Sequence, residues 1–120
     1  MSKTAKPKFQ LDPSPTFVAN VEIPTHGGNL AEVGFTFKHR TRDEMFAFRD
    51  SLKTPEAVDD EEVKPGPTDV EVIMSVASGW DLDEPFDVKS VTKLVQNYIA
   101  APIAILTAYY AELSGARTKN

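Results

Sequence analysis

The 120-residue sequence contains no cysteine, which excludes disulfide frameworks, thiolate zinc sites and thiol nucleophiles. It has only two histidines, His26 and His39, and neither has a carboxylate at metal-ligand spacing, so we expect both to be ordinary surface residues. No apolar run is long enough to cross a bilayer, and the basic first eight residues lack the apolar stretch of a signal peptide. The sequence therefore predicts one soluble, unexported domain without metal or cofactor.

A concentrated basic region is also missing. Residues 1–53 carry eight positive and six negative side chains, and residues 54–87 carry one positive and eleven negative side chains. Residues 88–120 carry four positive and one negative. Because duplex-binding domains usually present a basic face, this distribution argues against a nucleic-acid partner. A basic protein, or a second copy of the chain, is the expected partner.

Two segments of alternating polarity predict a β-hairpin after a flexible tail formed by the proline- and lysine-containing residues 1–15. Residues 16–23 and 31–37 each place their apolar side chains on one face; these are Phe17, Ala19, Val21 and Ile23, then Ala31, Val33, Phe35 and Phe37. The intervening Gly27-Gly28 pair suits a turn, and it lacks the context of a phosphate-binding loop. A lone hairpin is marginal in water, so other elements must cover its apolar face.

Three helix starts follow, each with recognisable capping chemistry. Thr41 and Thr68 each precede a glutamate by three residues, which is the pattern of a capping box, and Asp87 can cap a third helix. The first helix should have a buried stripe of Met45, Phe48 and Leu52. Apolar residues at helical spacing follow in the second, Val70, Ile73, Ala77 and Trp80, and in the third, Val88, Val91, Leu94, Val95 and Tyr98. Gly79 would end the second helix. Residues 55–67 should form an acidic loop, because proline and repelling charges oppose helix.

A last helix is predicted from Pro102 to Ser114, with Gly115 as its C-terminal cap and a polar tail at residues 116–120. One stripe contains Ile103, Leu106, Tyr110 and Leu113, and further apolar residues, including Ile105, Ala108 and Tyr109, fill most of the remaining surface. A helix that is apolar nearly all round must be covered on more than one side. We therefore expect partner binding or self-association to involve Ile105, Ala108, Tyr109, Glu112, Lys89 and Lys93.

No motif predicts catalysis. The acidic residues Asp81, Asp83, Glu84 and Asp87 lack the central glycine and distal glutamate of a calcium loop, and Glu84 and Asp87 suit the positive end of the following helix. The serines have no nucleophile-elbow context. Trp80 and Phe86 are expected to be core residues. The predicted fold is α+β and helix-dominated, with an N-terminal β-hairpin, about four α-helices and a single domain over residues 16–115.

The chain resembles the small tail assembly chaperones of long-tailed bacteriophages, in particular the lambdoid type with noncontractile tails. The likeness spans about residues 30–120. It is carried by the strand sequence at 35–38, by Ser-Gly-Trp-Asp-Leu at 78–82, by Pro85-Phe86, by residues 94–98 and by the ending at 109–120.

This resemblance implies a non-catalytic late protein that coats the helical tape measure protein in the host cytoplasm and keeps it soluble. Such proteins help recruit the tail tube protein, leave as the tube polymerises and are absent from the virion. Relatives assemble into rings or spirals, and many are also made as a longer, frameshifted product that contacts the tube protein. Lys119-Asn120 needs codons of the form AAR-AAY, which could provide a slip site.

An alternative interpretation is another phage or prophage interaction protein, such as a head-tail connector or an acidic inhibitor of a host nucleic-acid enzyme. The acidic segment supports that alternative. A chaperone for an amphipathic helix instead needs exposed apolar surface and reversible contacts. Segregated charge would also favour head-to-tail packing of copies.

Overall fold

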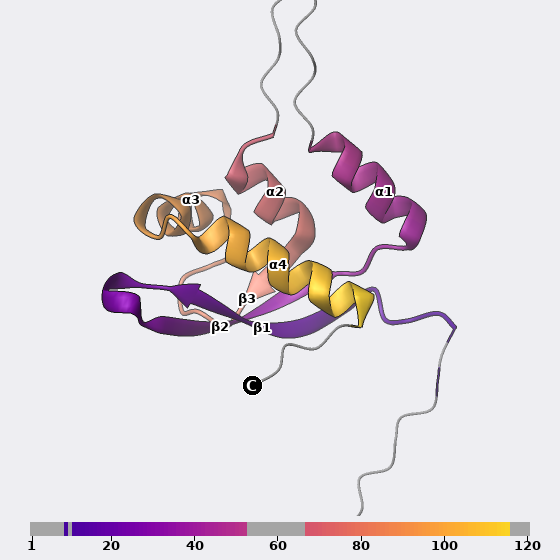
Figure 1. The fold of residues 1–120 in the computed structure, drawn as a ribbon, viewed down its shortest axis with the longest axis horizontal. Helices are drawn as coiled ribbons and strands as arrows, with labels where there is room; N and C mark the ends of the chain where they lie inside the picture. The colour runs from indigo at the N-terminus through magenta and orange to yellow at the C-terminus, as the bar shows by residue number, and fades with distance from the viewer. Residues whose placement is uncertain (1–8, 10, 53–66, 116–120) are drawn as a thin grey trace, which may run out of the picture.

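The computed structural model describes residues 9, 11–52 and 67–115. Its sheet has three antiparallel strands in the order β1-β2-β3, and the helices lie on one face of it (Figure 1). β1 (Thr16–Pro24) and β2 (Leu30–Lys38) form the predicted hairpin, paired from Thr16↔Lys38 to Pro24↔Leu30. A short 3-10 turn joins them, η1 (His26–Gly28), where both glycines have φ of 78°. Positive φ is costly for other residues, so this turn requires glycine.

The predicted second helix ends earlier than expected. Helix α2 (Asp69–Val76) stops before Ala77, and residues 77–80 form strand β3 (Ala77–Trp80), paired with β2 through Phe35↔Trp80 and Phe37↔Ala77. The apolar spacing of Ala77 and Trp80 suits a helix, but Gly79 weakens one. The edge of β2 offers this segment backbone hydrogen bonds instead, and Trp80 packs edge-on to Phe35 with ring centroids 6.0 Å apart. Tertiary pairing therefore overrides the helical pattern.

The remaining helices begin where the capping chemistry predicts. α1 (Arg42–Ser51) and α2 both have complete capping boxes, from Thr41 to Glu44 and from Thr68 to Glu71. α3 (Val88–Asn97) begins at Asp87, whose carboxylate accepts a hydrogen bond from the Ser90 N–H at 2.8 Å. α4 (Ala101–Ser114) ends at Gly115 in the left-handed conformation, as expected for a C-terminal glycine.

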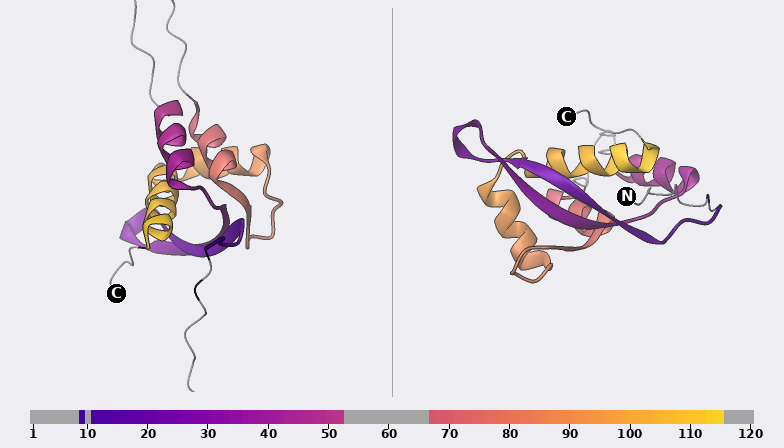
Figure 2. Two further views of the ribbon diagram at one scale, coloured as in Figure 1. Left: turned by 90° about the vertical axis from the view of Figure 1, so that its right-hand side faces the viewer. Right: turned by 90° about the horizontal axis from the view of Figure 1, so that it is seen from below.

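The core lies between the sheet and the helices. Its buried members from the sheet include Val21, Ile23, Phe35, Phe37 and Ala77, and those from the helices include Phe48, Ile73, Val76, Val91, Ile105 and Tyr109. The two further views in Figure 2 show α4 running along the sheet while α3 lies across one end of it. The α+β fold with a hairpin and four helices is thus confirmed. The acidic segment 55–67 lies outside the described residues except for Pro67.

The apolar surface of α4 is used differently from the prediction. The fully buried stripe is Ala101, Ile105 and Tyr109, whereas Ile103 is 73% exposed. Leu106, Tyr110 and Leu113 pack against the core and remain partly exposed. The sheet and the other helices therefore cover most of a helix that was expected to need a partner or a second copy to cover part of its apolar surface.

Candidate functional site

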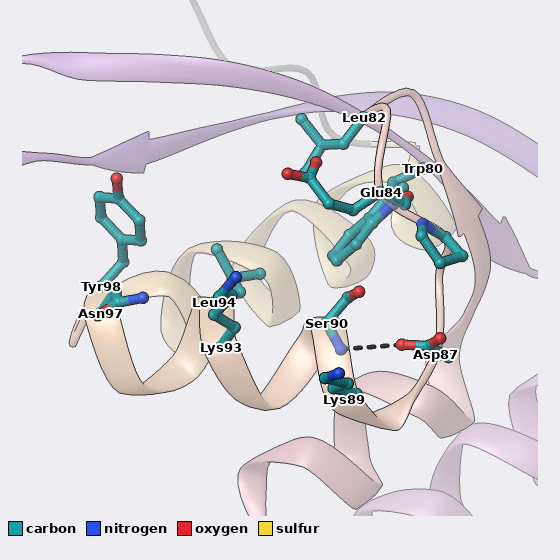
Figure 3. A pocket seen from close by; sticks show the side chains of 11 residues that line it. Trp80, Leu82, Glu84, Asp87, Lys89, Ser90, Lys93, Leu94, Asn97 and Tyr98 are labelled. Atoms are coloured by element: carbon teal, nitrogen blue, oxygen red, sulfur yellow. Dashed lines mark hydrogen bonds between the residues drawn. The ribbon is translucent and has the colours of Figure 1, made fainter.

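A groove of about 500 Å³ lies between α3 and the segment 81–87 that leads into it (Figure 3). Trp80, Leu82, Leu94 and Tyr98 supply most of its apolar lining. Polar side chains line it as well, among them Glu84, Asp87, Ser90, Asn97 and the two lysines Lys89 and Lys93. An apolar interior with a charged rim suits a protein segment as ligand.

The segment 81–84 is fixed to the sheet by two sets of hydrogen bonds. The Trp80 indole Nε1 donates to the carbonyl of Glu84 at 2.7 Å, and the Trp80 ring packs edge-on to Phe86 with centroids 5.0 Å apart. The Asp81 N–H donates to the Gly34 carbonyl at 2.9 Å, and the Gly34 N–H donates to Asp81 Oδ1 at 3.0 Å. These bonds hold one wall of the groove in place. Trp80 and Phe86 pack against the core, as the sequence predicted.

Gly34 permits the close approach of Asp81. A Cβ atom at Gly34 would lie 2.9 Å from Asp81 Oδ2, which is closer than real contacts allow. The need for glycine here comes from this packing against a side chain 47 positions later in the sequence, so the hairpin pattern alone could not reveal it.

The predicted partner residues do not form one surface. Lys89 and Lys93 are exposed, one helical turn apart, at the groove. Glu112 is exposed but borders a separate hollow beside Phe17 and His39. Ala108 is half-buried, and the expectation that Ile105 and Tyr109 lie on the surface is wrong, because both are fully buried.

Tyr109 is fully buried, and its hydroxyl joins the end of β2 to the half-buried side chain of Arg40. Its hydroxyl donates to the Lys38 carbonyl at 2.7 Å and accepts from Arg40 Nη1 at 2.9 Å. Arg40 also donates from Nη2 to the Ser75 carbonyl at 3.1 Å, and its guanidinium lies 4.2 Å from the centroid of the Phe48 ring. Burial raises the pKa of the Tyr109 hydroxyl above its ordinary value, while the hydrogen bond from Arg40 opposes that shift. These contacts give Tyr109 a structural role.

A second exposed apolar surface lies at the junction of α3 and α4. It consists of Tyr98, Ile99 and Ile103, which we call the apolar corner; Ile99 is 91% exposed and Ile103 is 73% exposed. Sequence reasoning placed Ile103 on one apolar stripe of the last helix, outside the expected partner residues, and gave Ile99 no role. The position of Ile99 in the short break before Pro102 was the available signal, since a residue outside both helices does not belong to the apolar stripe of either one.

Within the described residues, no cluster of three or more histidine, aspartate or glutamate side chains could hold a metal ion. No helix in the same part of the chain has the length and apolar character needed to span a membrane. The groove and the apolar corner are two places where the described residues expose apolar side chains.

Comparison with known protein families gives a match to a family described as phage tail assembly chaperone, over residues 4–120. The chain belongs to the phage tail assembly chaperone family. The match includes the strands, the four helices, the groove and the apolar corner. No curated protein and no solved structure matches this chaperone significantly. The family assignment agrees with the resemblance seen in the sequence, and it supports a role in assembling phage tails.

Proposed function

We propose that this chaperone binds the tape measure protein through the apolar corner and keeps it soluble while the tail tube polymerises around it. The supporting observation is the exposure of Ile99 and Ile103 within five residues of each other, next to the groove. Solvent-exposed isoleucines that lie close together are typical of protein contact sites. Membership in the tail assembly chaperone family supports a contact that is made during tail assembly.

The size of the apolar corner favours weak, reversible binding. Burying one isoleucine side chain contributes about 1.5–3 kcal/mol, so Ile99 and Ile103 together contribute about 3–6 kcal/mol before the entropic cost of association is subtracted. A single copy would then bind at millimolar affinity or weaker. Several linked copies on one long client would gain strength by avidity, and a growing tube that buries more surface could displace them.

The test is to co-express the tape measure protein with the chaperone and measure the fraction of client that stays soluble. Ile103→Asp should abolish this effect, because a buried carboxylate opposes the contact. The matched control is Val18→Asp, which changes an apolar residue that is 70% exposed on the face of the sheet opposite the helices. Full client solubility with Ile103→Asp, in a protein whose circular dichroism is unchanged, would contradict the proposal.

Recruitment of the tail tube protein and absence from the finished virion are further parts of the proposed role. A longer frameshifted product would carry the contact to the tube protein. Sequencing the gene around the codons for Lys119 and Asn120 tests this point, because a slippery heptamer and an overlapping frame are both required. Mass spectrometry of purified virions should detect no peptides of the chaperone.

A further inference from the structure

Helix α1 leaves most of its surface uncovered. Phe48 is the one buried residue among its ten, and the helix lies beside the C-terminal end of α4 (Figure 1). A hollow of about 790 Å³ opens between α1 and that end of α4. It shares no lining residue with the groove or the apolar corner. The distance along α4 from Ile103 in the apolar corner to Leu113 in the hollow is about 15 Å, since each residue adds about 1.5 Å.

The hollow has an apolar lining that faces water. Phe46 is 61% exposed, although its neighbour Phe48 is buried in the core. A single exposed apolar side chain is ordinary, but Phe46 belongs to a group that borders one hollow. That group consists of Phe9, Leu11, Met45, Phe46, Tyr110 and Leu113. Covering Phe46 with a partner would therefore remove a large apolar surface from water.

Two exposed arginines flank this apolar lining. Arg42 and Arg49 lie seven residues apart on α1 with Phe46 between them, so the three share one helix face and the arginines are about 10 Å apart along the axis. The Arg49 guanidinium lies over the Tyr110 ring, 5.0 Å from its centroid. A guanidinium that stacks on a ring keeps the N–H donors at its edge available to a carboxylate. The third arginine of the lining, Arg40, already donates to two groups inside the protein.

The charge of the hollow is opposite in sign to that of the whole chain. The net charge of the sequence is −5, yet none of the described residues that line the hollow is acidic. Asp43 and Asp50 point about a quarter turn away from Arg42 around the helix axis, and the Glu44 carboxylate accepts a hydrogen bond from the Thr41 N–H. Because salt screens distant charges over about 8 Å, the arginines in the lining dominate what a bound ligand meets.

These features favour an acidic protein segment over a nucleic acid. Proteins that depend on phosphate contacts use about 6–10 of them, whereas this hollow offers two exposed arginines and the chain as a whole repels a polyanion. A carboxylate matches the two-pronged donor geometry of arginine. An amphipathic helix that carries carboxylates two turns apart would meet Arg42 and Arg49, and its apolar side chains would cover Phe46.

We propose that the hollow between α1 and the C-terminal end of α4 binds an acidic amphipathic helix of a second protein. Its carboxylates pair with Arg42 and Arg49, and its apolar face packs on Phe46. This contact goes beyond the proposed function, because it uses the opposite end of α4 from the apolar corner. One chaperone can then hold the tape measure protein and an acidic partner at the same time.

An NMR titration of the ¹⁵N-labelled full chain tests the contact. The probe is a synthetic amphipathic peptide with leucine and phenylalanine on one face and glutamate at the other positions. It should give saturable shifts in residues 42–49 and 110–114, with little change in residues 88–103. A peptide with lysine in place of every glutamate should leave the hollow unchanged, although the net charge of the chain would favour it. Equal shifts at the hollow from both peptides, or none from the glutamate peptide, would overturn the proposal.

Variants then test the named residues. Arg42→Glu/Arg49→Glu and Phe46→Asp should each weaken binding of the glutamate peptide at least about tenfold. The matched control Lys89→Glu/Lys93→Glu reverses the same amount of charge on α3 and should change binding less than about twofold. The lysine peptide should bind the hollow of Arg42→Glu/Arg49→Glu more tightly than that of the unsubstituted chain. Undiminished binding of the glutamate peptide by either hollow variant, with circular dichroism showing that it is folded, contradicts the assignment.

A single-stranded oligothymidine is the probe for the nucleic-acid alternative. If it shifts residues 42–49 at lower concentration than the glutamate peptide does, the hollow is a nucleic-acid site and the proposal is wrong.

The two surfaces can be tested separately. Phe46→Asp should still keep the tape measure protein soluble, and Ile103→Asp should still bind the glutamate peptide. If Ile103→Asp loses the client while the hollow variants bind the peptide normally, the client proposal stands and the hollow inference fails. If the hollow binds the peptide as expected while Ile103→Asp retains the client, the hollow inference stands and the client proposal fails.

Discussion

Tyr109→Phe removes one hydroxyl from a fully buried position and leaves the aromatic ring in place. The Lys38 carbonyl then loses a donor at 2.7 Å, and Arg40 Nη1 loses an acceptor at 2.9 Å. A neutral hydrogen bond contributes about 1 kcal/mol, and one to a charged group contributes about 1.5–3 kcal/mol. Because Arg40 keeps its bond to the Ser75 carbonyl, we expect the free energy of unfolding to fall by about 3 kcal/mol.

Urea denaturation followed by Trp80 fluorescence measures this change. With an m-value of about 1.5 kcal/mol/M, the midpoint should fall by about 2 M while m stays constant. Tyr109→Ala is the less informative variant, since the cavity alone would cost about 3–5 kcal/mol and could unfold a domain of ordinary stability. A loss below about 0.5 kcal/mol in Tyr109→Phe would refute the reasoning, because it would mean that the buried hydroxyl stabilises nothing.

The pH dependence provides a second check on Tyr109. Its pKa is raised in the folded state, mainly by burial, so above pH 10 the unfolded chain loses this proton while the folded chain keeps it. The contribution of Tyr109 to stability is therefore complete below pH 10 and is lost as the pH rises toward the folded pKa. The difference in unfolding free energy between the unsubstituted chain and Tyr109→Phe should shrink above pH 10.

Other positions give predictions of the same kind. Gly34→Ala should lower the free energy of unfolding, measured in urea, by about 1–2 kcal/mol, because the new Cβ displaces the Asp81 carboxylate from its hydrogen bond. In a chain that already carries Asp81→Ala, the same substitution should lower the unfolding free energy much less. Thr41→Ala should lower the unfolding free energy by about 1 kcal/mol at pH 7. Hydrogen bonds from the Thr41 backbone and side chain lower the pKa of Glu44, so the stability contributed by that carboxylate is present above pH 4.5 and is lost as the pH falls through the folded pKa. The destabilising effect of Glu44→Ala should therefore diminish below pH 4.5, and an effect that stays constant to pH 3 would argue against this role of the carboxylate. Trp80→Phe removes the bond to the Glu84 carbonyl, so hydrogen exchange should become faster in residues 81–84, and unchanged exchange would show that Asp81 alone holds the segment.

Local features were predictable because their causes lie within a few residues. The alternation in residues 16–23 and 31–37 requires strands, and two glycines between them permit the turn. Thr41, Thr68 and Asp87 satisfy backbone donors at helix starts regardless of the rest of the fold, and Gly115 ends α4 for a similar reason. The family resemblance also depended on sequence alone, and the match over residues 4–120 confirms it.

Tertiary structure decided the features whose energy comes from distant partners. Residues 77–80 became a strand because β2 had an open edge, which no local pattern records. An α4 that is apolar nearly all round has no single preferred face, so contacts with the sheet and Arg40 selected Ile105 and Tyr109 for the core. The same choice left Ile103 exposed beside Ile99. The sequence by itself thus determined the elements and the family, whereas the surfaces available to partners depended on how the elements packed.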